Sequence, residues 1–104
     1  MTDSISIKDV YSKIVQQRQI LEDINKEIDR QDKIWGEQNH SLAEWMTILG
    51  EEFGEACAEV SEIRMAKGLK EMTKAIHRLD EELVQVVAVC FRILEKVRLQ
   101  NVNS

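Results

Sequence analysis

The sequence predicts an all-α fold of long antiparallel helices. Three observations indicate this class: apolar residues recur at spacings of three and four along most of the chain, the chain contains no proline, and its 4 glycines leave long uninterrupted segments. A chain of 104 residues has room for one core. We therefore predict one helical domain that spans residues 1–104.

The first predicted helix covers residues 7–31. Its apolar residues follow a helical period: Val10, Ile14, Leu21, Ile24 and Ile28. Ser6 suits the N-cap position, where its hydroxyl can accept a hydrogen bond from the first turn. The stretch Ile34–His40 breaks the apolar pattern, so we expect a loop there.

Two further helices are predicted over residues 41–67 and 69–99, with Gly68 as the break between them. Ser41 followed by Glu44 is typical of a capping box at a helix N-terminus. Trp45 falls in the apolar stripe of the second helix, which favours core packing. Both helices have apolar faces wide enough to need more than one neighbour, so self-association as a homodimer or homotetramer is expected to complete the bundle.

Composition excludes several kinds of partner. The net charge of −5 argues against nucleic acid, whose binders usually present a basic surface. The polar start of the chain and the absence of a long apolar run argue against a signal peptide and a membrane anchor. Cys57 and Cys90 lie in helical apolar patterns without C-x-x-C spacing, which fits small buried side chains in the reducing cytoplasm.

Two acidic helix motifs, Glu52-x-x-Glu55 and Glu82-x-x-Gln85, are the main functional signal. At about 100° per residue, Glu52 lies inside the apolar arc of its helix, and Glu55 and Glu59 lie on one flank of that arc. A buried carboxylate needs a partner, and carboxylate oxygens are ligands that divalent cations prefer. These motifs predict a metal site.

The third predicted helix adds positive charge beside the second motif. Lys74 and Arg78 share one side of that helix with Glu82 and Gln85. Oxygen ligands for Mg²⁺ next to cations suit a metal-bound polyphosphate. Asp80 falls in the apolar sector, where it would be either a member of a buried ion pair or a further ligand.

Together these motifs resemble the MazG-like all-α nucleoside triphosphate pyrophosphohydrolases. The likeness covers residues 35–94 and rests on Glu52-x-x-Glu55, a 26-residue interval and Glu82-x-x-Gln85, with Gly50 and Gly54 around the first pair. The segments W-G-E-Q-N-H and E-E-L-V-Q-V-V-A are similar to those of short phage and bacterial members. The resemblance implies that Glu52, Glu55, Glu82 and Gln85 hold Mg²⁺, or Mn²⁺ in its place. Gln85 departs from the aspartate usual at the fourth position and offers a neutral oxygen instead of a carboxylate.

The resemblance also implies a reaction. Water activated by the metal attacks between the α and β phosphorus atoms, which releases a nucleoside monophosphate and pyrophosphate. Either Glu51 or Glu55 would orient the water as the catalytic carboxylate, and the sequence does not choose between them. Lys74 and Arg78 are the candidates for contacts to the phosphates.

The base or sugar is expected to meet the segment before the second helix. Trp35 can stack on a base, and Asn39 and His40 offer hydrogen-bond donors and acceptors to its edge. His40 precedes Glu52 by twelve residues, the spacing at which the resembled family places a histidine near the nucleotide. His77, on the third helix, is interpreted as an ordinary surface histidine.

Two other functions remain compatible with the sequence. One is a catalytically weak nucleotide-binding or helical protein-interaction module that keeps the fold, for which Gln85 is the sequence signal. The other is a purely structural bundle, which neutralisation of Glu52 would stabilise.

Overall fold

The computed structural model describes residues 6–36 and 38–103, and within these it contains three helices and no strand. They are α1 (Ile7–Trp35), α2 (Leu42–Met65) and α3 (Leu69–Asn103). The predicted all-α class is thus confirmed. Within the described ranges, none of the helices is both long enough and apolar enough to cross a membrane.

The predicted end of the first helix is wrong by about one turn. Helix α1 continues through Ile34 to Trp35 and stops at Gly36, whose φ of 65° is a left-handed conformation that favours glycine. The backbone N–H of Gly36 donates to the Asp32 carbonyl over 2.8 Å. A break in the apolar pattern is therefore not a stop signal in this chain, whereas the glycine is. Glu37, in the expected loop, lies outside the described residues.

Helix α2 begins as the sequence predicts. The Ser41 hydroxyl accepts from the Glu44 N–H at 3.1 Å, and the Ser41 N–H donates to the Glu44 carboxylate at 3.0 Å, which completes the capping box. The helix ends at Met65, earlier than expected, because Ala66 turns to an extended conformation. Helix α3, in contrast, continues past its predicted end at residue 99 as far as Asn103.

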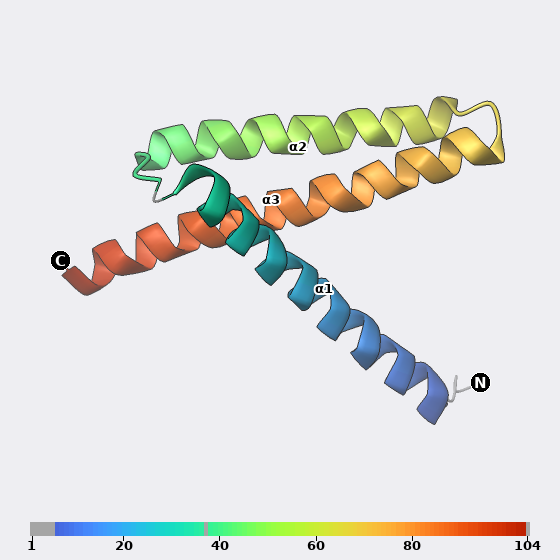
Figure 1. The fold of residues 1–104 in the computed structure, drawn as a ribbon, viewed down its shortest axis with the longest axis horizontal. Helices are drawn as coiled ribbons and strands as arrows, with labels where there is room; N and C mark the ends of the chain where they lie inside the picture. The colour runs from blue at the N-terminus through green and yellow to red at the C-terminus, as the bar shows by residue number, and fades with distance from the viewer. Residues whose placement is uncertain (1–5, 37, 104) are drawn as a thin grey trace, which may run out of the picture.

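Helices α2 and α3 form an antiparallel hairpin; the C-terminal part of α1 crosses α3, and its N-terminal part projects away from the hairpin (Figure 1). The core is small, and its buried apolar residues come from all three helices: Ile28, Trp45, Ala56, Ala75, Ala88 and Val89. Alanine at three of these positions lets the helix backbones approach closely. The burial of Trp45, which is 6% exposed, confirms its predicted core role.

One arginine fastens α1 to α3. Arg92 of α3 donates through Nη2 to the Ile28 carbonyl at 3.3 Å and to the Asp32 carboxylate, and through Nη1 to Glu95 at 3.2 Å. The bonds to Ile28 and Asp32 hold the C-terminal third of α1 against the hairpin, where Ile28 and Gln31 are buried. That third of α1 is consequently the part that can contribute to a site on α2 and α3.

Much of the apolar surface lacks a partner within the chain. The large hydrophobic residues of α1 before Leu21, and Leu21 itself, are exposed, as are Phe53 on α2 and Leu83 on α3. The predicted burial of Cys57 is wrong: this residue is exposed, because α2 packs on α3 alone and Cys57 faces away from it. Cys90 is half-buried.

Candidate metal and nucleotide site

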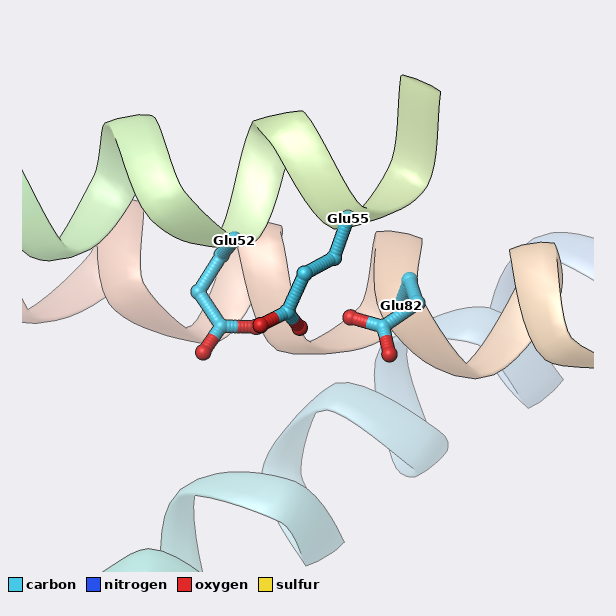
Figure 2. Close-up of side chains that lie close together, drawn as sticks. All are labelled: Glu52, Glu55 and Glu82. Carbon is cyan, nitrogen blue, oxygen red and sulfur yellow. The ribbon is translucent and has the colours of Figure 1, made fainter. Parts of the chain in front are cut away.

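Three glutamates from two helices meet in the hairpin. Glu52 and Glu55 of α2 and Glu82 of α3 each bring one carboxylate oxygen to within 4.8 Å of the other two. Figure 2 shows these side chains directed to the same side of the α2–α3 pair. The structure thus unites the acidic residues of both sequence motifs.

Helical spacing and close packing explain this convergence. Residues three apart on a helix lie on one face, which places Glu52 and Glu55 one above the other on α2. The next residue, Ala56, is 3% exposed and lies against α3. Because its side chain is only a methyl group, α3 comes near enough for Glu82 to reach the pair.

The three carboxylates are electrostatically unfavourable without a cation. The pKa of Glu82 is raised to about 7, most of all by burial, and further by a hydrogen bond to Glu55 and by the negative charges of Glu55, Glu52 and Glu59. Burial also raises the pKa of Glu52, with smaller contributions from Glu55 and from Glu27 of α1. A divalent cation would relieve both the desolvation and the repulsion, so the donor set fits a hard metal ion.

Gln85 joins the two helices at this point. Hydrogen bonding assigns its amide nitrogen to the position 3.1 Å from Glu52 Oε2 and 3.2 Å from Glu82 Oε2, so the amide donates to both carboxylates. An aspartate at this position would add a fourth negative charge and no donor. The glutamine therefore reduces repulsion in the metal-free protein, and rotation of its amide would present the carbonyl oxygen that a metal ligand requires.

A cavity of about 320 Å³ opens beside the carboxylates. Its walls include Glu52 and Gln85, and Trp35, His40 and Trp45 line it as well. The rings of His40 and Trp45 pack edge to face with their centroids 4.9 Å apart. Trp35, which lines this cavity, is 56% exposed. The predicted base-binding residues Trp35 and His40 are thus neighbours of the predicted metal ligands.

Other predicted site residues lie elsewhere. Glu51 is exposed and is not among the converging carboxylates, which leaves Glu55 as the better placed of the two catalytic candidates. Asn39 is exposed in the connection before α2 and does not line the cavity. Asp80 is exposed, so its predicted place in a buried ion pair is wrong. The reason is that α1 and α3 do not close over Asp80, which lines an open cavity between them. Asp80 is not among the converging carboxylates either.

The predicted phosphate-binding cations lie farther along the hairpin. Arg78 donates to Glu59 over 2.9 Å, and it lines a small hollow together with Lys74 and Glu71. This hollow shares no lining residue with the cavity that contains Glu52. Arg78 still lies near the carboxylates, because its partner Glu59 contributes to the raised pKa of Glu82. His77 is exposed and pairs with Glu81 at 3.0 Å, in agreement with its surface assignment.

Sequence reasoning missed the contribution of α1. Arg30 and Gln31 line the cavity beside Glu52, and Gln38 lines it from the connection before α2. In the sequence, Arg30 is one member of an i,i+3 pair with Glu27, a pattern that usually marks a solvated helix face. Only the crossing of α1 over α3 brings this pair to the site.

Comparisons with models of protein families, with curated proteins and with solved structures give no match to this chain. The all-helical fold and the carboxylate site are therefore the features from which its function is inferred.

The raised pKa of Glu82 predicts pH-dependent stability in the metal-free protein. Between the ordinary value of 4.5 and about 7, native Glu82 keeps a proton that the unfolded chain has lost, so the free energy of unfolding falls as pH rises through this window. Because Glu82 is only half-buried, we expect a screened loss on the order of 1 kcal/mol. Urea unfolding in EDTA at about pH 5 and about pH 8 measures it. In Glu82→Gln the loss should be smaller, because only Glu52 then keeps a raised pKa, and an equal loss in that variant would assign the effect to other groups.

Proposed function

We propose that this protein is a Mg²⁺-dependent nucleotide pyrophosphohydrolase that converts a nucleoside triphosphate, or a related nucleotide, to the monophosphate and pyrophosphate. The observation that carries the proposal is the convergence of Glu52, Glu55 and Glu82, of which Glu52 also lines a cavity with aromatic side chains. The resemblance of the two acidic motifs to MazG-like enzymes supports the same reaction.

The residues divide into a metal-holding and a substrate-holding group. Glu52, Glu55 and Glu82 hold Mg²⁺, or Mn²⁺, and Gln85 serves as fourth ligand when its amide oxygen faces the ion. The metal neutralises phosphate charge and makes water a better nucleophile. Glu55, the exposed member of the three, is also the side chain placed to accept a proton from that water.

The nucleoside end occupies the cavity of about 320 Å³. Trp35 stacks on the base, and His40, whose ring Trp45 supports at 4.9 Å between centroids, hydrogen-bonds to its edge. Burial of Trp45 keeps this wall rigid.

A panel of ribo- and deoxyribonucleotides, including alarmones, tests the proposal through pyrophosphate and monophosphate release with Mg²⁺ and with EDTA. We expect turnover only with the metal.

A second function, a nucleotide-binding or helical interaction module of weak activity, is favoured by one observation: the Gln85 amide donates to the carboxylates where the resembled family has another acid. Mg²⁺-dependent nucleotide binding without products would establish that second function.

We propose further that the bundle is completed by one or three more copies of this chain. In α1, the described residues as far as Glu22 are exposed, and they include Ile14 at 44% and Leu21 at 62%. Exposed apolar area of this extent on three helices is typical of an association surface. Light scattering should give a dimer or tetramer, and Leu21→Asp should lower the mass. A monomeric wild type at micromolar concentration would contradict this.

A further inference from the structure

We infer that Arg30 of α1 binds the phosphate chain of the nucleotide. The inference rests on the proposed function, and it names a phosphate-binding residue other than Lys74 and Arg78. Its basis is the position of Arg30 at the boundary of two cavities, the first of which contains Glu52.

Arg30 and Gln85 are the two residues common to both cavities. The first cavity contains Trp35, His40 and Glu52, and the second, of about 430 Å³, lies between α1 and α3 and contains Lys26, Glu27 and Glu81. Arg30 and Gln85 thus mark the boundary between the two cavities, and the Gln85 amide donates to Glu52 and Glu82. A phosphate chain that extends from a base in the first cavity along Glu52 would reach Arg30 at this boundary.

Charge balance requires a cation at this place. A nucleoside triphosphate carries more negative charge than one Mg²⁺ neutralises, and the three glutamates add to the excess. Among the described residues that line the cavity with Glu52, Arg30 is the only lysine or arginine. Arg78, by contrast, is engaged with Glu59 and opens onto a different hollow.

The guanidinium of Arg30 is already oriented. Its Nε and Nη2 donate to the two oxygens of Glu27 at 2.8 and 2.7 Å, and Gln31 donates to the same carboxylate at 2.9 Å. The guanidinium carbon lies 5.9 Å from the centroid of the Trp35 ring. This bidentate pair uses one edge of the guanidinium and leaves the Nη1 and Nη2 edge for a second bidentate contact, the geometry that phosphate oxygens accept.

Glu27 thus positions Arg30, and α1 carries both. The turn that bears them is held to α3 by Arg92, through the Ile28 carbonyl and Asp32. Arg30 also lies over the indole ring of Trp35. The turn of α1 that carries Glu27 and Arg30 therefore supports both the residue that stacks on the base and the residue that binds the phosphates. A plain counter-ion of Glu27 would need neither the stacking contact nor a place on both cavities.

The test is the affinity of the protein for inorganic tripolyphosphate, measured by calorimetry in the presence of Mg²⁺. Tripolyphosphate carries the phosphate chain without a base. Charged hydrogen bonds of this kind correspond to about a 10- to 100-fold change in affinity, so Arg30→Met should bind tripolyphosphate more weakly than the wild type by that factor. The affinity of Arg30→Lys should lie between those of the wild type and Arg30→Met, since lysine keeps the positive charge but not the bidentate geometry of the guanidinium. Arg18→Met, an exposed arginine on the projecting half of α1, should bind as the wild type does.

A separate Mn²⁺ titration distinguishes the possible failures. Arg30→Met should bind Mn²⁺ at least as tightly as the wild type, because a nearby positive charge has been removed, whereas Glu52→Gln should bind it weakly. If Arg30→Met binds tripolyphosphate like Arg18→Met while Glu52→Gln does not bind it, the inference is wrong and the proposed function stands. If the wild type binds neither Mn²⁺ nor tripolyphosphate, both are wrong.

Discussion

Replacement of Glu52 by glutamine should abolish metal-dependent turnover without unfolding the protein. Loss of a supporting group at a metal site typically costs 10- to 100-fold in affinity or activity, so the loss of a carboxylate ligand should cost at least about 100-fold. In the wild type the Gln85 amide nitrogen lies 3.1 Å from Glu52 Oε2. The amide of a glutamine at position 52 keeps an oxygen that can accept the same hydrogen bond. The fold therefore retains its link between α2 and α3.

The same substitution should stabilise the metal-free protein. Burial and the neighbouring carboxylates raise the pKa of Glu52, which means that its charge is unfavourable in the native state above the ordinary pKa. We expect a gain of up to about 1 kcal/mol in EDTA, since solvent screens a half-buried group, and no gain with Mg²⁺. Pyrophosphate release and urea unfolding measure the two effects.

A matched control is Glu62→Gln. Glu62 is an exposed glutamate farther along α2 and lies outside the group of converging carboxylates. It should keep full turnover and change stability little. Retained turnover in Glu52→Gln would remove this carboxylate from the metal site and leave the second function, or a structural bundle, as the explanation of the acidic motif.

The largest loss of stability should come from Trp45→Ala. Trp45 is the largest side chain in the core, is 6% exposed and lines both the cavity beside Glu52 and the neighbouring cavity of about 490 Å³. Truncation of a buried tryptophan costs about 3–5 kcal/mol through lost burial and the space left behind. In a small domain this approaches the whole free energy of unfolding. Urea unfolding of the variant should show a much lower midpoint.

Trp35→Ala is the informative comparison, because it makes the same substitution at a residue that is 56% exposed. We expect a loss of less than about 1 kcal/mol in stability. Stacking on a base is worth about 1–3 kcal/mol, so nucleotide affinity should fall by about 10-fold or more. Titration with the best substrate of the panel measures this fall. Equal stability losses in the two variants would contradict the assignment of Trp45 to the core and Trp35 to the ligand.

The positions of Glu52, Glu55 and Glu82 illustrate how local and tertiary information combine. Spacing on one helix predicts that Glu52 and Glu55 share a face, since helical geometry is local. That Glu82 joins them depends on the register of two helices across their contact at Ala56. The motif resemblance supplied this pairing, and neither periodicity nor composition contains it.

Exposure shows the opposite case. An apolar stripe predicts which residues seek burial, but it does not say whether the partner lies in the same chain. Phe53 and Cys57 fit helical apolar patterns and are nevertheless exposed, because α1 crosses α3 and leaves α2 with one neighbour.

The sequence by itself determined the helical class, the approximate ends of the three helices, the capping box at Ser41 and the core role of Trp45. These follow from periodicity and from hydrogen bonds between residues a few positions apart. Only the tertiary structure shows that Arg30 and Gln31 line the cavity beside Glu52 and that Lys74 and Arg78 line a different hollow. The physical reason is that the crossing of α1 depends on long-range contacts, such as that of Arg92 with Asp32, which leave no local pattern in the sequence.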